Sequence, residues 1–251
     1  MPAPLPLDPA DFTARFDAAA RAAGFAVEQF GAIHGHPLLA YTKPAVRPGA
    51  PAIYVSTGMH GDEPAPPWAL LRAVESGQFD ARASWWLCPL LNPTGFAART
   101  RENFAGVDLN RDYKHPTAAE VIVHVAWLRR QPRFDAAFCL HEDYEATGFY
   151  LYELNPDNRP SLADVILAAA AQHVPIEAAA VIDGRESAAP GIIRPVNDPL
   201  LRDDWPEAIY LHYHHTTLGY TFETPSPLAP EARMAALAAA LRAALDNLLG
   251  A

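Results

Sequence analysis

The sequence has few cysteines, no long apolar run and no basic amino terminus, and each absence excludes a class of protein. Only two cysteines occur in 251 residues, Cys88 and Cys139, each inside an apolar segment typical of a buried strand. Without a Cys-x-x-Cys pair or a secretory context, we expect core thiols rather than a disulfide or a reactive thiol. No run of about 18 apolar residues occurs, and the amino terminus lacks the pattern of a signal peptide. A cytoplasmic protein without a membrane partner is therefore expected.

Basic residues are also in the minority. Lysine and arginine number 19 against 29 aspartates and glutamates, so the formal net charge is -10. A chain with this charge balance has no basic surface that could bind a phosphate backbone, so we do not expect nucleic acid as a partner. The composition, 50% hydrophobic and 19% charged, is that of a packed globular chain. The length is common for one α/β domain, so we expect residues 1–251 to form a single domain.

Helical and strand patterns alternate along the chain. Asp8 and Pro9 are typical of an N-cap and a first turn, and they predict a helix that ends near Gly24. The turn at 34–36 is expected to be a hairpin tip. Further helices are expected over 66–77, 118–130, 161–172 and 231–249, and strands over 52–57, 84–91, 134–142, 148–154 and 210–226. This alternation predicts a layered α/β fold with a mixed sheet.

Residues 92–116 form an irregular stretch that is too long for an ordinary connection and is therefore expected to be functional. Its polar side chains include Arg99, Arg101, Asn110 and Arg111. Arginine offers a planar fork for a carboxylate and a fixed positive charge for an oxyanion. A surface arginine usually has neither role, so each of them alone carries little weight.

Candidate metal ligands follow two of the expected strands. His60 and Glu63 come three residues apart after the strand at 52–57, and His141 ends the strand at 134–142. Ends of strands in an open α/β sheet are where binding sites collect. Two nitrogens and one carboxylate, with a fourth position for water, make the usual catalytic zinc arrangement. The alternative for His141 is a hydrogen-bonded core histidine.

A candidate general base ends the last expected strand. Glu223 follows aromatic and β-branched residues in GYTFETPS. Partial burial at such a position raises the pKa of a carboxylate towards the range of a general base. The alternative is a carboxylate that caps the following turn.

Taken in order, the segments HGDE, NPTG with TRENFAGVDLNRD, LHE and FETPS resemble the zinc metallocarboxypeptidases, the family of carboxypeptidase A, and the length is closer to its small bacterial members. The resemblance spans Ala52 to Ser226. It implies one zinc per chain, held by His60, Glu63 and His141. It implies that Glu223 is the base that activates water. The fold it implies is a three-layer α/β/α sandwich with a mixed sheet of about eight strands.

The same resemblance implies roles for the polar residues of the irregular stretch. The arginine that polarises the scissile carbonyl falls on Arg101, with Arg99 as the rival. Asn110 and Arg111 fall on the pair that binds a free carboxylate of the substrate. Asp112 stands where many relatives have asparagine, and its charge is expected to compete for Arg111.

Two further roles are implied by resemblance. Asp108 matches an aspartate that orients the first zinc-binding histidine, here His60, although a turn aspartate is the alternative. The family also has a mobile tyrosine over the substrate, which we place at Tyr210, with Tyr213 and Tyr220 as rivals. The histidines at 212–215 have no counterpart in the motifs and are interpreted as exposed strand residues that could line the pocket.

The leading functional hypothesis is a zinc metallocarboxypeptidase that hydrolyses a peptide or amide bond next to a free carboxylate. The alternative is a related zinc deacylase or amidase, such as an acyl-amino-acid deacylase, an aspartoacylase-like or desuccinylase-like enzyme, or a murein-peptide amidase, which would share the ligand set. The expected partner is accordingly a peptide or an acylated amino acid. An inactive binding relative is disfavoured because no ligand is missing from the sequence.

Overall fold

The structure, a computed structural model that describes residues 5–195 and 198–250, is built around a mixed sheet of eight strands. In spatial order the strands are β1 (Ala26–Ile33), β2 (His36–Lys43), β4 (Ser84–Cys88), β3 (Ala52–Ser56), β5 (Ala136–Asp143), β10 (Gly219–Pro225), β6 (Tyr150–Leu154) and β9 (Ile192–Ile193). A separate two-stranded pair consists of β7 (Val181–Ile182) and β8 (Arg185–Glu186). The predicted mixed α/β sheet is confirmed.

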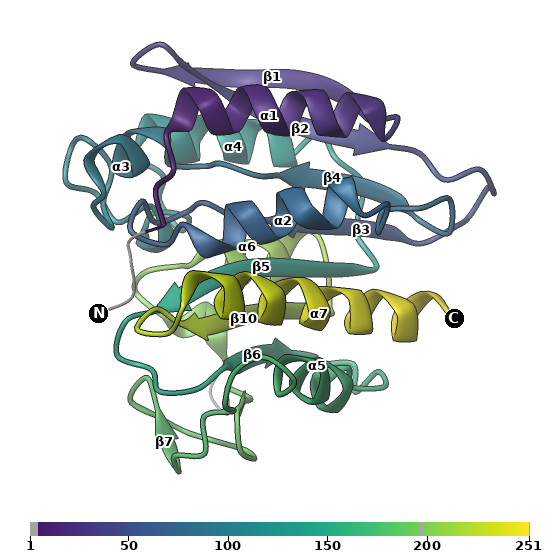
Figure 1. Cartoon of the computed structure of the whole chain (residues 1–251), viewed down its shortest axis with the longest axis vertical. Helices are drawn as coiled ribbons and strands as arrows, with labels where there is room; N and C mark the ends of the chain where they lie inside the picture. The colour runs from purple at the N-terminus through teal and green to yellow at the C-terminus, as the bar shows by residue number, and fades with distance from the viewer. Residues whose placement is uncertain (1–4, 196–197, 251) are drawn as a thin grey trace.

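Helices cover both faces of this sheet (Figure 1). The face towards the viewer carries α1 (Pro9–Ala22), α2 (Ala65–Glu75), α5 (Ala163–Ala170) and α7 (Pro230–Leu249), and the far face carries α4 (Ala119–Leu128) and α6 (Glu207–His214). Short helical turns occur at α3 (Pro93–Ala98), η1 (Leu109–Arg111) and η2 (Pro199–Leu201). Each face has its own apolar core, as a three-layer α/β/α sandwich requires. Within the described ranges, no helix is long and apolar enough to cross a membrane.

Local sequence signals account for the first elements. The carboxylate of Asp8 accepts hydrogen bonds from the backbone amides of Ala10 and Asp11, at 2.9 and 3.0 Å, which caps α1 as expected. The β1–β2 hairpin turns through His34 and Gly35, both with positive φ, at 48° and 84°. Such a two-residue turn matches the twist of the flanking strands. The predicted helix start and hairpin tip are both confirmed.

Three central strands bring their carboxyl ends to one edge of the sheet. β5 lies between β3 and β10 and is parallel to both. Ser56 pairs in register with Cys139, and His141 pairs with Glu223. Because neighbouring residues in parallel register project from the same face, the side chains of His141 and Glu223 start side by side. This arrangement places the candidate ligands and base at one edge of the sheet.

The expected strand at 210–226 is only half correct. Gly219–Pro225 forms β10, whereas Glu207–His214 forms the helix α6. Tyrosine favours strands by propensity, but here Tyr210 and Leu211 are buried in the apolar core between the helix and the sheet. Packing against the sheet therefore outweighs local preference in this segment.

Candidate active site

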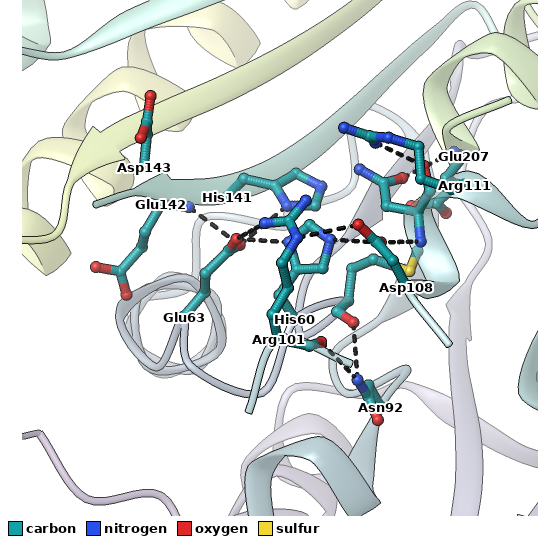
Figure 2. A network of polar contacts seen from close by, with 12 residues as sticks. His60, Glu63, Asn92, Arg101, Asp108, Arg111, His141, Glu142, Asp143 and Glu207 are labelled. Carbon is teal, nitrogen blue, oxygen red and sulfur yellow. Dashed lines mark hydrogen bonds and ion pairs between the residues drawn. The ribbon is translucent and has the colours of Figure 1, made fainter. Parts of the chain in front are cut away.

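The three predicted metal ligands converge at the carboxyl edge of the sheet. Nδ1 of His60 lies 2.5 Å from Oε1 of Glu63, and Nδ1 of His141 lies 3.0 Å from Oε2 of the same carboxylate. One ligand atom from each side chain lies within 4.8 Å of the other two, and all three residues are buried. Figure 2 shows the Glu63 carboxylate facing both imidazole rings. The group fits a small cation, because two nitrogens and one carboxylate are the donor set that zinc prefers.

The turn that carries two of these ligands, residues 58–63, is packed tightly against the rest of the chain. A Cβ atom on Gly61 would lie 1.9 Å from a backbone carbon of α3, so only glycine fits there. Nδ2 of the buried Asn92 donates to the carbonyl oxygens of Met59 and Arg101, at 3.2 Å each. Asn92 thus joins the ligand turn to the segment that supplies Arg101. We refer to residues 58–63 as the ligand turn.

Asp108 connects His60 to Arg101. One carboxylate oxygen lies 3.1 Å from Nε2 of His60, which leaves Nδ1 of that ring directed at Glu63. The other oxygen accepts a hydrogen bond of 3.0 Å from Nε of Arg101. A carboxylate bonded to one nitrogen of an imidazole fixes the ring and makes the other nitrogen a better donor to a metal. The contact is the one that the predicted orienting role of Asp108 requires.

Charges within the ligand group shift the pKa values of its members. Burial alone would lower the pKa of His60, but Glu63 and Asp108 raise it to about 9. Burial would raise the pKa of Glu63, yet the two histidines beside it hold that pKa below its usual range. The pKa of His141 is lowered by burial, which Glu63 only partly offsets. Glu63 therefore remains a carboxylate, and His141 favours the neutral form that binds metals.

Glu223 stands next to the ligand group without contacting it through a hydrogen bond. It pairs in register with His141 and lines the same cavity as the ligands. Loss of water around the carboxylate raises its pKa well above the usual value, and the negative charges of Glu63, Asp143 and Asp183 act in the same direction. A carboxyl group with a raised pKa is suited to proton transfer near neutral pH.

One cavity of about 670 Å³ connects these groups. The predicted site residues that line it are His60, Glu63, Arg101, Asn110, Arg111, His141 and Glu223. Arg99, the rival of Arg101, is exposed at the end of α3 and does not belong to this lining. The volume is that of a site for a small molecule or the end of a short peptide.

Asn110 and Arg111 already have partners at the cavity wall. Oδ1 of Asn110 accepts a hydrogen bond of 2.9 Å from the backbone amide of Glu207, the first residue of α6. Nε of Arg111 lies 3.3 Å from a carboxylate oxygen of Asp204, and both side chains are 41% exposed. The Arg111 guanidinium is therefore accessible to solvent and lines the cavity, with Asp204 as its ion-pair partner.

The prediction that Asp112 competes with the substrate carboxylate for Arg111 is wrong. The Asp112 carboxylate instead accepts hydrogen bonds of 2.8 Å from the Thr117 amide, the Thr117 hydroxyl and the Ala118 amide. These contacts order the chain just before α4, so the aspartate has a local structural role. Asp204, more than ninety residues further along the chain, is the acid that pairs with Arg111.

The placement of the mobile tyrosine at Tyr210 is also wrong. Its side chain is 3% exposed and packs among aromatic rings of the core under α6. Among the described residues that line the cavity, the tyrosines are Tyr144, Tyr150 and Tyr152, and neither Tyr213 nor Tyr220 is one of them. Tyr144 follows His141 by three residues and is 70% exposed. The exposed tyrosine at the cavity therefore follows a predicted ligand, His141, and does not belong to the segment before Glu223.

Two other features stay outside the ligand group. The histidines at 212–215 lie on α6 and at its end rather than on a strand, and none of them lines the cavity. His215 is buried, which lowers its pKa. Cys88 and Cys139 are buried free thiols, as expected from the sequence.

A buried carboxylate that the sequence did not single out lies behind the site. The hydroxyls of Tyr54 and Ser56 each donate a hydrogen bond of 2.7 Å to Glu207. Burial raises the pKa of Glu207 to about 7. These partners lie about 150 positions away along the chain, so no local pattern could have indicated them.

The raised pKa of Glu207 predicts a pH-dependent stability. The folded protein keeps a proton on Glu207 that the unfolded chain releases above the ordinary value of 4.5. The resulting stability is fully present below about pH 4.5 and is lost as the pH rises through about 7. Glu207→Gln keeps a neutral polar side chain between its partners and should flatten this decline, by on the order of 2 kcal/mol between pH 5 and 8. Urea unfolding of both metal-free proteins at the two pH values measures the difference, and equal declines would contradict it.

The fold and the His-Glu-His group together define a metallohydrolase with a carboxypeptidase-like architecture. Residues 49–191 match the family described as the succinylglutamate desuccinylase/aspartoacylase catalytic domain. The chain belongs to this family. A comparison with curated proteins gave no match.

Solved structures agree with this assignment. A protein proposed to be a metallopeptidase, from Shewanella amazonensis, has 27% sequence identity and a TM-score of 0.83, covering 94% of this chain and 92% of its own. Another, from Shewanella denitrificans, has 25% identity and a TM-score of 0.81, covering 94% of this chain and 88% of its own. A metallo-carboxypeptidase from Burkholderia cenocepacia has 19% identity and a TM-score of 0.69, covering 96% and 68%, and so shares the fold. The predicted relationship to metallocarboxypeptidases is confirmed, and the family match narrows it to the succinylglutamate desuccinylase/aspartoacylase family.

Proposed function

We propose that this protein is a zinc-dependent hydrolase that cleaves an amide bond next to a free carboxylate, acting as a carboxypeptidase on short peptides. The observation that supports this most is the convergence of His60, Glu63 and His141 in a cavity that Glu223 also lines. A metal-binding group and a carboxylate of raised pKa in one cavity are the two components that metal-assisted hydrolysis needs. None of the components has been lost from this chain.

The chemistry divides between the metal and the protein. When bound at His60, Glu63 and His141, zinc would supply a Lewis acid that acidifies water and polarises a carbonyl. Glu223 would accept the proton of the attacking water and then give it to the leaving nitrogen. Arg101, held by Asp108, would stabilise the negative charge that develops on the carbonyl oxygen.

The family assignment favours a second candidate within the same chemistry. The matching family is described by two deacylating enzymes, succinylglutamate desuccinylase and aspartoacylase. An acyl-amino-acid deacylase would use the same ligands and the same base on a substrate that also carries a free carboxylate. A screen of short peptides against N-acylated amino acids, each with a free or amidated carboxylate, separates the two activities.

Binding of the free carboxylate is expected to depend on Arg111. Arg111→Ala should raise KM for free-acid substrates by roughly 10- to 100-fold, because a hydrogen bond between charged groups is lost. Amidated analogues should be unaffected, and Arg101→Ala should instead mainly lower kcat. Steady-state kinetics on matched free-acid and amidated substrates make the comparison. Arg99→Ala is the control, since this arginine is exposed and outside the cavity.

The acid beside Arg111 gives the same experiment a second arm. An exposed ion pair contributes at most about 1 kcal/mol, so Asp204→Asn should lower KM for free acids by no more than about fivefold.

If wild-type protein hydrolyses amidated and free-acid substrates equally well, Arg111 is not the carboxylate-binding residue and an amidase activity is favoured.

A further inference from the structure

A buried ion pair lies directly behind the ligand turn. Glu142 follows His141 at the end of β5, and its side chain is 0% exposed. One carboxylate oxygen pairs with a guanidinium nitrogen of Arg233, a residue of α7 that is itself nearly fully buried. The other oxygen accepts a hydrogen bond of 2.6 Å from the backbone amide of Ala65, the first residue of α2.

Glu142 also contacts a predicted metal ligand through its main chain. Its backbone amide donates a hydrogen bond of 3.1 Å to Oε2 of Glu63, the oxygen that faces His141 (Figure 2). Ala65, which the Glu142 side chain holds, comes only two residues after Glu63. One residue therefore fixes both the carboxylate of Glu63 and the backbone that carries it.

We propose that Glu142, held in place by Arg233, is a positioning residue that fixes Glu63 in the orientation needed to bind the metal. The inference rests on the proposed zinc site but concerns a pair that contacts no substrate in that proposal. A carboxylate next to the first amides of a helix is favourable, because those amides and the helix dipole stabilise negative charge. A fully buried carboxylate without a cation would destabilise the folded protein, and Arg233 supplies that cation.

The chain offers a control ion pair that links the same two helices, α2 and α7, which Glu142 connects through Ala65 and Arg233. Arg72 of α2 and Glu231 of α7 form a two-pronged ion pair at 2.5 and 2.7 Å. Their side chains are 43% and 72% exposed, and the hydrogen bonds of the Arg72 side chain go to Glu231 and not to the ligand turn. A general role in docking α7 onto α2 would be shared by both pairs, whereas a role in metal binding belongs only to Glu142 and Arg233.

The test is the zinc dissociation constant of the full-length protein, measured by competition with a coloured chelator. Glu142→Gln and Arg233→Met should each weaken zinc binding by about 10- to 100-fold, as loss of an outer-sphere contact typically does. The double variant should be no weaker than the worse single variant, because both changes break one interaction. Arg233→Lys should restore most of the affinity, and Arg72→Met should leave it unchanged. Circular dichroism at the assay temperature establishes that each variant is folded.

Variants that melt at lower temperature but bind zinc within twofold of wild type would overturn the inference and leave the pair a purely structural one. Equal weakening by Arg72→Met would also overturn it, since the effect would then come from helix docking. Absence of zinc binding by the wild-type protein would overturn the proposed metal site itself, and this inference with it.

Discussion

Glu223→Gln is expected to lower kcat/KM for an amide substrate by roughly 10²- to 10⁴-fold, the usual contribution of a positioned acid or base. Glutamine has nearly the same size as glutamate but cannot accept the proton of the attacking water. The Glu223 side chain makes no hydrogen bond or ion pair with His60, Glu63 or His141, so metal content and thermal stability should stay close to wild type. Steady-state hydrolysis of a short peptide, with zinc content measured on the same preparation, gives both numbers.

Glu75→Gln is a suitable control for this variant, because Glu75 is exposed at the end of α2 and does not line the cavity. Near-normal turnover in Glu223→Gln would remove Glu223 from the mechanism. Loss of zinc in the same variant would show that Glu223 is a ligand instead.

The second large effect is expected from the double variant His60→Ala, His141→Ala. It removes both nitrogen ligands and leaves Glu63 as one carboxylate, which cannot hold zinc at stoichiometric occupancy. Zinc content should fall to background, and hydrolysis should fall with it. A double variant of two exposed histidines outside the cavity, His34→Ala with His173→Ala, should keep both. Stoichiometric zinc in the first double variant would mean that the metal binds elsewhere.

Much of the site could be predicted because each residue lies at the end of an element with a clear local pattern. His60 and Glu63 follow β3, His141 lies near the carboxyl end of β5, and Glu223 lies near the carboxyl end of β10. Once these strands are expected to be neighbours in a parallel sheet, their carboxyl ends must meet at one edge. The ligand geometry is then a consequence of the sheet.

Long-range packing accounts for what could not be predicted. The residues around Tyr210 have a composition typical of a strand or a mobile loop. Only the burial of the Tyr210 side chain between α6 and the sheet shows that it belongs to the core. The partners of Arg111, Glu142 and Glu207 are about 90 to 150 positions away in the chain. Pairings at such separations are set by the fold and leave no periodic signal in the sequence.

The central claim is that one metal at His60, Glu63 and His141 supports amide hydrolysis. The most direct measurement starts from wild-type protein stripped of metal by a chelator and follows hydrolysis of a free-acid peptide or acyl-amino acid while zinc is added back. We expect no hydrolysis without metal, and activity that rises with zinc and levels off at one equivalent per chain. Full hydrolysis by the metal-free protein, or zinc bound at one equivalent with no hydrolysis of either substrate class, would contradict the account.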